Sequence, residues 1–404
     1  MAKMLEATLF LVISCTTALF HDRTDPANRV VLVLYTGGTI GMKPTPDGYR
    51  PDQLGDGILE SEHFHNKSYN LTEEECSIKT KYTPLLTLPF YKKLRTLYHI
   101  HQYSQLLDSS NMNMTHWRKI AKDIEKYYND FDGFVVLHGT DTMAYTASVL
   151  SFMLENLSKP VIVTGAQVPI YEVMSDGSAN FQGALVIAGH YPINEVTLYF
   201  NHKLFRGNRA TKRSAEGFDA FESPNYPVLA NVGTSIKVKH GGNLSNGPFR
   251  VNTTLNENVG VLWLYPGITS AIVKSFLQDP IKGVVLKTFG SGNVPEHLVE
   301  ELKNACDKGI IIVSTSQCAV GHVTDDYLGK MLKDAGVIPG ADMTTEAAVA
   351  KLSYLLGRSD LSNEKRKEML QSNLRGELTD KQSIAMPQQT FCNGDKFKQD
   401  CNAN

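Results

Sequence analysis

The chain has 404 residues, of which 42% are hydrophobic and 20% are charged, and its formal net charge is −2. This length predicts two or three domains, and the composition excludes a disordered, collagen-like or coiled-coil chain. The near balance of 40 basic and 42 acidic residues argues against a nucleic-acid-binding protein. The only long apolar run spans about 13 residues and is too short to cross a bilayer, so a polytopic membrane protein is excluded.

Residues 1–20 are predicted to be a secretory signal peptide. One lysine precedes the apolar stretch from Thr8 to Phe20, and Thr16 and Ala18 are small residues around a candidate cleavage site. The alternative is a buried N-terminal strand or helix. The signal is favoured because the polar, turn-prone segment His21 to Arg29 separates this stretch from the first strong strand. A secreted, extracellular protein is therefore expected.

Six N-x-[ST] sequons also favour passage through a eukaryotic secretory pathway and predict a glycoprotein. They lie at Asn66, Asn70, Asn113, Asn156, Asn243 and Asn252.

Five cysteines remain once the signal is removed, so at least one thiol is expected to stay unpaired. Cys392 and Cys401 bracket a short polar tail and could form a disulfide. Cys306, in an amphipathic helix, and Cys318, after an apolar strand, are predicted to be small buried side chains.

Short apolar runs alternate with helical patterns along the chain. Most of the apolar runs are continuous, which is typical of strands buried on both faces of a parallel sheet. The sequence therefore predicts an α/β fold, with a doubly wound N-terminal domain and a smaller C-terminal α/β domain with parallel sheets. Strands are predicted at Val30–Tyr35, Phe134–Leu137, Val161–Thr164, Val196–Phe200, Val259–Tyr265, Gly283–Thr288 and Ile310–Ser314. Helices are predicted at Thr115–Tyr128, Thr142–Leu157 and Thr344–Leu356, the last with Thr344 or Thr345 as N-cap and Gly357 as its stop.

The region around 241–258 is rich in Gly, Asn, Ser and Thr, and it lacks a hydrophobic period. We place the domain linker there, between an N-terminal domain at 29–240 and a C-terminal domain at 259–375. The polar tail at 376–404 is expected to be loosely ordered.

Polar residues follow the first three predicted strands, at the end where open α/β sheets bind ligands. The three segments are Thr36-Gly37-Gly38-Thr39-Ile40-Gly41, His138-Gly139-Thr140-Asp141-Thr142 and Gly165-Ala166-Gln167. Taken singly, a Gly-Gly turn or a Thr-Asp pair before a helix is more often structural than functional. Their joint occurrence after consecutive strands favours a site, because the fold brings those strand ends together.

Two of these segments, Y-T-G-G-T-I-G-M at Tyr35–Met42 and L-H-G-T-D-T-M at Leu137–Met143, resemble the two signature motifs of the bacterial-type L-asparaginase family. The resemblance covers about residues 29–375, and its C-terminal segments look most like the cytosolic, type I branch, which includes the asparaginase domain of larger eukaryotic proteins described as lysophospholipases. Further matching segments lie at Asp108–Met112, Thr164–Pro169, Arg209–Lys212, Gly290–Pro295, Gln317–Gly321 and Ala335–Ala347.

The resemblance implies hydrolysis of L-asparagine to L-aspartate and ammonia, without a cofactor. It assigns Thr39 as the nucleophile, which needs a base or a polarised partner to react. Tyr49 matches a tyrosine that could take part in that proton transfer. Thr140, Asp141 and Lys212 match a second set that would activate the second step or a water. Backbone N–H groups near Gly139 and Thr140 are candidate oxyanion donors.

The same resemblance assigns substrate-binding residues. Asp141 would accept hydrogen bonds from the α-ammonium group, and Ser109 with Ser110 would hold the α-carboxylate. Asp108 would face the ammonium or support the loop, and Thr140 also contacts substrate. Some family members complete the site with an acidic residue from a neighbouring subunit. No such residue can be placed here, so the third member of the first triad stays open.

Other functions remain as alternatives. One is a related amidohydrolase that prefers L-glutamine, and another is a secreted, catalytically idle binding protein on the same scaffold. Against the second, the five matched catalytic residues are all present. No G-x-S-x-G motif supports a lipase, and the His63/His65 and His99/His101 pairs lack nearby carboxylates or cysteines that would indicate a metal site. The resemblance implies a homo-oligomer, a dimer or tetramer, with no nucleic-acid or membrane partner.

Overall fold

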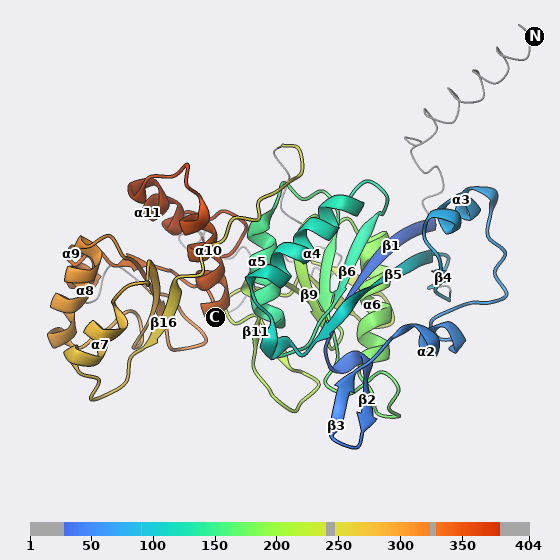
Figure 1. Ribbon diagram of the computed structural model, residues 1–404, viewed down its shortest axis with the longest axis horizontal. Coiled ribbons are helices and arrows are strands. Elements are labelled where there is room, and N and C mark those ends of the chain that lie inside the picture. Colours follow the sequence, from blue (N-terminus) through green and yellow to red (C-terminus); the bar gives the residue numbers. More distant parts are fainter. Residues whose placement is uncertain (1–27, 90, 240–246, 324–328, 380–404) are drawn as a thin grey trace, which may run out of the picture.

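The computed structural model describes residues 28–379, except for residue 90 and the segments 240–246 and 324–328. The predicted signal, the Asn243 sequon and the Cys392–Cys401 pairing therefore lie outside the described residues. Two sheets form the framework, one in each part of the chain, as Figure 1 shows. No described helix is long and apolar enough to cross a membrane.

The larger sheet has nine strands within the described residues, in the order β14-β13-β10-β9-β8-β6-β1-β5-β4. Its centre is parallel, because β1 pairs in parallel with both β5 and β6, and β8 and β9 continue the series. The strands at its two edges are antiparallel, so the sheet is mixed. The strands are β1 (Asn28–Gly37), β4 (Leu85–Thr87), β5 (Arg95–Leu107), β6 (Gly133–Leu137), β8 (Val161–Thr164), β9 (Val196–Phe200), β10 (Lys203–Arg206), β13 (Ala230–Val232) and β14 (Ile236–Val238).

Helices cover both faces of this sheet, as the doubly wound prediction requires. One apolar cluster joins alternate β1 side chains such as Val31 and Val33 to α6, and the other joins Leu32 and Leu34 to α4 and α5. Because side chains alternate along a strand, β1 supplies both clusters. The helices of this part are α2 (Gly55–Glu60), α3 (Glu73–Lys81), α4 (Met114–Tyr127), α5 (Met143–Met153) and α6 (Gly177–His190).

The smaller sheet is fully parallel, in the order β16-β17-β18-β19. Its helix α10 (Thr345–Gly357) packs on α5 of the larger part, so one apolar cluster runs through both. The α/β fold with a parallel C-terminal sheet is confirmed. The other elements are β16 (Val259–Trp263), β17 (Gly283–Thr288), β18 (Ile311–Ser316), β19 (Ile338–Pro339), α7 (Ser270–Phe276), α8 (Val299–Asp307), α9 (Gly329–Asp334) and α11 (Asn363–Gln371).

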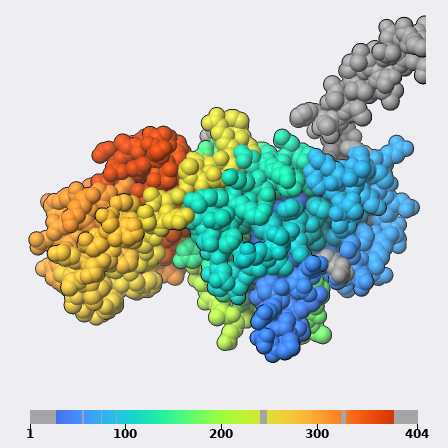
Figure 2. Space-filling model, in the orientation of Figure 1, coloured from blue at the N-terminus to red at the C-terminus, as the bar shows by residue number. Residues whose placement is uncertain are grey.

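Short elements connect this framework. They include β7 (Leu154–Glu155), β11 (Thr211–Lys212), β12 (Phe221–Glu222), β15 (Arg250–Val251) and the hairpin β2 (Met42–Thr45) with β3 (Gly48–Pro51). In Figure 2 the hairpin is a blue projection from the surface.

Several sequence predictions need correction. The helix predicted to reach Leu157 ends at Met153, because the next two residues form β7 and pair with β15. Strand β15 itself lies in the segment predicted as a linker. Cys318 is exposed, because β18 ends at Ser316 and Cys318 falls in the following loop. Cys306 is half-buried in α8, and this burial raises the pKa of its thiol to about 11.

Candidate active site

Three parallel strands end side by side at the site. The left-handed backbone at Gly37 and Gly38, with φ of 118° and 86°, lets the chain leave β1 sharply. A Cβ on Gly38 would lie 2.3 Å from the backbone nitrogen of Gly139, and one on Gly139 would lie 2.6 Å from Oγ of Ser109. The segments after β1, β6 and β5 are therefore in direct contact, which only glycine at these two positions permits.

A cleft of about 190 Å³ opens at these strand ends. Six of the predicted site residues line it: Thr39, Asp108, Ser109, Thr140, Asp141 and Lys212. Tyr49 and Ser110 are not among the lining residues, which otherwise are Gly38, Met42, Gly139, Gln167 and Ala215. The strand-end argument thus brings together residues that lie up to 173 positions apart in the sequence, from Thr39 to Lys212.

Lys212 connects the predicted second set. Its Nζ donates to Oγ1 of Thr140 at 2.9 Å and to Oδ1 of Asp141 at 2.7 Å. Thr140 in turn donates to Oε1 of Gln167 at 3.1 Å. The Lys212 side chain is 19% exposed and that of Asp141 is 65% exposed, so the carboxylate faces the open side of the cleft. Since a charged ammonium only donates, the Thr140 hydroxyl proton is directed at Gln167.

Hydrogen bonds from both its side chain and its backbone hold Gln167 in place. Its amide nitrogen donates to the carbonyl oxygens of Ala215 and Gly217, and its backbone nitrogen donates to Asp176 at 3.0 Å. These bonds fix which end of the amide faces Thr140. Gln167 therefore presents an acceptor, and not a donor, to the threonine hydroxyl.

The strand that carries Lys212 is anchored to the C-terminal part of the chain. Arg209 forms a buried ion pair with Asp342 at 2.8 Å, and Thr211 donates to Oε1 of Glu346 at 2.7 Å. Burial raises the pKa of the Glu346 carboxyl. Thr211 and Glu346 also line a separate cavity of about 220 Å³. These contacts give the Arg209–Lys212 and Ala335–Ala347 segments a physical connection.

The loop after β5 divides the predicted carboxylate-binding residues. Ser109 is 3% exposed, lines the cleft, and accepts a hydrogen bond on its carbonyl from Oγ1 of Thr142 at 2.7 Å. Ser110 is exposed and does not line the cleft, and its backbone nitrogen donates to Oδ1 of Asp108 at 2.9 Å. Asp108 thus shapes the loop while it borders the cleft.

Tyr49 lies on β3 of the projecting hairpin and is 52% exposed. Its hydroxyl donates to Oε1 of Glu172 at 3.0 Å. That hydrogen bond to a carboxylate raises the pKa of Tyr49. The structure therefore does not bring Tyr49 together with the cleft residues.

His138 is buried next to Gly139, one of the residues that line the cleft. It is fully buried, with Nδ1 2.7 Å from the carbonyl oxygen of Gly139 and Nε2 2.8 Å from Oγ1 of Thr146. Trp117 donates its indole N–H to the same Thr146 hydroxyl at 2.8 Å. Because a carbonyl only accepts and an indole only donates, Nδ1 carries the proton and Thr146 donates to Nε2. This chain orients the Gly139–Thr140 peptide, and burial lowers the pKa of His138 to about 4.

Among the described residues, no group of three or more His, Cys, Asp or Glu side chains could hold a metal ion. The cleft chemistry visible here consists of hydroxyl, amide, carboxylate and ammonium groups.

Sequence comparison agrees with this geometry. Residues 30–243 match the family described as Asparaginase, N-terminal, and residues 258–370 match the Glutaminase/Asparaginase C-terminal domain. The chain belongs to the asparaginase family. The protein named L-asparaginase from Dirofilaria immitis is 47% identical over 362 residues, which are 86% of this chain and 60% of that protein. The chain thus spans less than two thirds of that relative.

Relatives of similar length also match. Escherichia coli (strain K12) L-asparaginase 1 is 45% identical over 361 residues, covering 87% of this chain and 98% of the relative. The crystal structure of L-asparaginase I from Vibrio cholerae O1 superposes with a TM-score of 0.75 at 44% identity. It covers 87% of this chain and all of that structure.

Membership of the family does not by itself assign roles to Gln167 and His138, and the sequence prediction gave them none. Both residues stand in the polar segments that follow predicted strands, so their position was a usable signal. Their roles depend on long-range contacts: Gln167 donates to the carbonyl of Ala215, and Trp117 donates to the Thr146 hydroxyl that bonds His138. Nothing in the local sequence indicates those partners.

Proposed function

We propose that this chain is an L-asparaginase that hydrolyses L-asparagine to L-aspartate and ammonia with Thr39 as nucleophile. The hydrogen-bonded set of Thr140, Lys212 and Asp141, in one cleft with Thr39, carries the proposal. Relatives of 45% and 47% identity that are named L-asparaginase support it.

In the first step the Thr39 hydroxyl oxygen bonds to the side-chain amide carbon of asparagine. The carbonyl oxygen becomes an oxyanion, which the backbone N–H groups near Gly139 and Thr140 stabilise. The carbon–nitrogen bond then breaks, and the proton lost by Thr39 completes the departing ammonia. An aspartyl ester on Thr39 remains.

In the second step a water attacks that ester. The water proton passes through the Thr140 hydroxyl to the Lys212 amine, which takes part in its uncharged form, and it returns to the Thr39 oxygen as aspartate leaves. Lys212 is placed for this because it already hydrogen-bonds Thr140 at 2.9 Å. Gln167 keeps the Thr140 hydroxyl in one orientation between turnovers.

Substrate recognition uses the rim of the cleft. The partly exposed Asp141 carboxylate accepts from the α-ammonium group, and Asp108 borders the same side. Ser109 supplies polar groups for the α-carboxylate. Tyr49 joins Thr39 only after it leaves Glu172, because a phenol bonded to a carboxylate is a poor proton acceptor.

Ammonia release by the full chain, measured with asparagine and with glutamine, tests the proposal. Thr39→Ala and Thr140→Ala should each abolish release from asparagine. Thr80→Ala, which removes an exposed hydroxyl on α3, is the matched control and should keep full activity. A folded protein that releases no ammonia from either amide would refute the enzyme proposal and favour an idle binding protein.

Glutamine is the second candidate substrate, since one of the matching family descriptions includes glutaminase. One added methylene changes binding in a pocket by only about 1–3 kcal/mol. The ratio of kcat/KM for the two amides therefore decides the substrate. A ratio above one in favour of glutamine would reverse the assignment.

The proposal extends to secretion, with residues 1–20 as the signal and the sequons as glycan sites. Expression of the chain with and without residues 1–20 in eukaryotic cells tests this. Protein should appear in the medium only with the segment present, and a glycosidase should lower its mass. Retention of the full chain inside the cells would contradict it.

A homo-oligomer, dimer or tetramer, is the last part of the proposal. Val261, Trp263 and Tyr265 alternate along and just beyond β16, the edge strand of the smaller sheet, and are 39%, 54% and 47% exposed. Such an apolar row is typical of an association surface. Trp263→Lys should lower the mass measured by light scattering, whereas Met331→Lys, at another exposed apolar side chain on α9, should not.

A further inference from the structure

The 373–379 segment, which follows α11, packs between the two parts of the molecule. Gly376, Glu377 and Leu378 are buried, although they fall in the predicted polar tail. Leu378 is 3% exposed and belongs to the apolar cluster that runs through both parts. The segment is therefore a packed part of the fold.

A buried ion pair attaches this segment to α10. Lys351 and Glu377 are both completely buried, and their side chains form a salt bridge. Lys351 also donates to the carbonyl of Leu370 at 3.0 Å, and Glu377 accepts from the backbone nitrogen of Leu374 at 3.0 Å. Because each buried charge has a counter-charge and further hydrogen bonds, the attachment is well satisfied. It does not involve the last described residue, Thr379.

The other end of the segment closes around Arg209, which is 2% exposed. The Nε, Nη1 and Nη2 atoms of Arg209 donate, in that order, to the carbonyl of Gly376 at 2.7 Å, to Oδ2 of Asp342 at 2.8 Å and to Oγ1 of Thr379 at 3.1 Å. The Thr379 hydroxyl in turn donates to the same Asp342 oxygen at 2.6 Å. Arg209, Asp342 and Thr379 thus form a closed ring of hydrogen bonds.

This ring lies three residues before Lys212 in the chain. Between them, Thr211 of β11 donates to Glu346 on α10 at 2.7 Å. Neighbouring side chains of a strand point to opposite faces, so Lys212 points the other way, to Thr140, which it reaches at 2.9 Å. Two attachments to the C-terminal part therefore set the position of Lys212. A displacement of about 1 Å in a catalytic group can cost about a hundredfold in rate.

We propose that Thr379 is a positioning residue for Lys212. Its hydroxyl completes the ring around Arg209, and the ring holds β11 where Lys212 reaches Thr140. Thr379 does not line the cleft, so it acts through Arg209 and not on the substrate. The inference rests on the proposed function, because it concerns the proton transfer through Lys212.

Thr379→Val tests the inference, because valine has a similar shape and lacks the hydroxyl. The backbone nitrogen of residue 379 still donates to Asp342, and the pair of Lys351 and Glu377 remains, so the segment should stay bound. We expect kcat for ammonia release from asparagine, per folded molecule, to fall about threefold to tenfold at nearly unchanged KM. Thr379→Ser, which restores the hydroxyl, should return kcat to within about twofold of the parent value.

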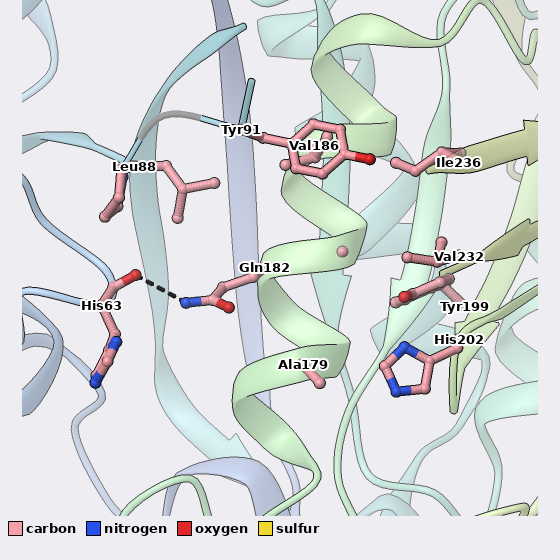
Figure 3. Close-up of a pocket in the computed structure, with 12 residues that line it drawn as sticks. His63, Leu88, Tyr91, Ala179, Gln182, Val186, Tyr199, His202, Val232 and Ile236 are labelled. Carbon is pink, nitrogen blue, oxygen red and sulfur yellow. Dashed lines mark hydrogen bonds between the residues drawn. The ribbon is translucent and has the colours of Figure 1, made fainter. Parts of the chain in front are cut away.

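Gln182→Leu is the matched control for the loss of one tertiary hydrogen bond. Gln182 donates its amide to the carbonyl of His63 at 2.8 Å, in a hollow of about 320 Å³ beside α6 that shares no lining residue with the cleft (Figure 3). This variant should lower the urea midpoint about as much as Thr379→Val does, and it should keep full kcat. A purely structural role for Thr379 would make the two variants alike, less stable and equally active.

Hydrogen–deuterium exchange gives a readout that needs no catalysis. Peptides that cover residues 207–213 should exchange about threefold to tenfold faster in Thr379→Val than in the parent chain or in Thr379→Ser. A parent chain that releases no ammonia but shows this exchange pattern would refute the proposed function and support the attachment of β11 through Thr379. Full kcat in Thr379→Val, an equal fall of kcat in Gln182→Leu, or unchanged exchange of these peptides would overturn the inference.

Discussion

The two sets of predicted catalytic residues differ in how firmly the structure holds them in the cleft. Thr140, Lys212 and Asp141 are joined by hydrogen bonds of 2.7 and 2.9 Å, and contacts from the C-terminal part anchor the strand beneath them. Tyr49, by contrast, is on a projecting hairpin and is bonded to Glu172. Packing holds the first set in place, whereas Tyr49 would reach the cleft only if its hairpin moved.

This contrast makes different variants fail in different ways. A substitution among Thr140, Asp141 and Lys212 should lower kcat directly, because these residues act in the chemical step. A change on the hairpin side should act on a conformational step as well, so it should be smaller and should separate kcat from KM.

Lys212→Met should have the largest effect, with kcat lower by about 10²–10⁴-fold, because Thr140 loses its proton partner. Steady-state ammonia release measures this. Lys203→Met, which removes an ammonium paired with Asp219 outside the cleft, is the control. A loss below tenfold would show that Lys212 only positions Asp141.

Tyr49→Phe should lower kcat by about 10–100-fold with little change in KM, because it removes a proton carrier and no substrate contact. The thermal midpoint should stay the same, since the lost hydrogen bond is exposed. Full activity in this variant would exclude Tyr49 from the reaction.

His138→Gln should change the acid sensitivity of the fold. The pKa of His138 is about 4 in the folded chain and about 6.5 unfolded, so the unfolded state binds a proton first. Its contribution is present above pH 6.5 and is lost as the pH falls toward 4, by on the order of 2–3 kcal/mol.

Urea unfolding between pH 7 and pH 4 measures that contribution. The variant should lose less stability over this range than the parent chain, although it starts from a lower value. His322→Gln, which removes an exposed histidine, serves as the control. Parallel curves for the parent chain and His138→Gln would contradict the buried neutral imidazole.

Glu172→Gln should have the smallest effect, a change in kcat/KM of about threefold or less. The substitution replaces the carboxylate whose hydrogen bond and charge raise the pKa of Tyr49 by a neutral amide, which should hold the Tyr49 hydroxyl less tightly. A loss above tenfold would instead make Glu172 the missing acidic partner of Tyr49. Comparing kcat/KM of this variant with that of Tyr49→Phe therefore shows whether Glu172 only holds Tyr49 away from the cleft or takes part in catalysis.

Sequence reasoning was most successful where a signal is local. The continuous apolar runs predicted β8, β9 and β17 with their observed bounds, and Thr344, one of the two predicted N-cap candidates, caps α10. It failed for β5, the 13-residue strand that carries the Ser109 loop, because its His, Gln and Ser residues hide the apolar pattern.

The residues of the candidate site were likewise predicted where a local signal exists and missed where the position depends on distant contacts. The strand-end rule and the family resemblance together predicted Thr39, Thr140 and Lys212, which share the cleft. They could not place Tyr49 outside it, because the position of a hairpin depends on a partner 123 residues away, Glu172. Cys318 was predicted to be buried because an apolar run precedes it, but the strand ends two residues earlier.

The most direct test of the account is the site of the covalent intermediate. Lys212→Met should be mixed with asparagine, quenched in acid within the first turnover, digested and analysed by mass spectrometry. The account predicts one equivalent of ammonia and an aspartyl ester on the peptide that contains Thr39. An ester on Thr140, or ammonia released with no ester on Thr39, would contradict it.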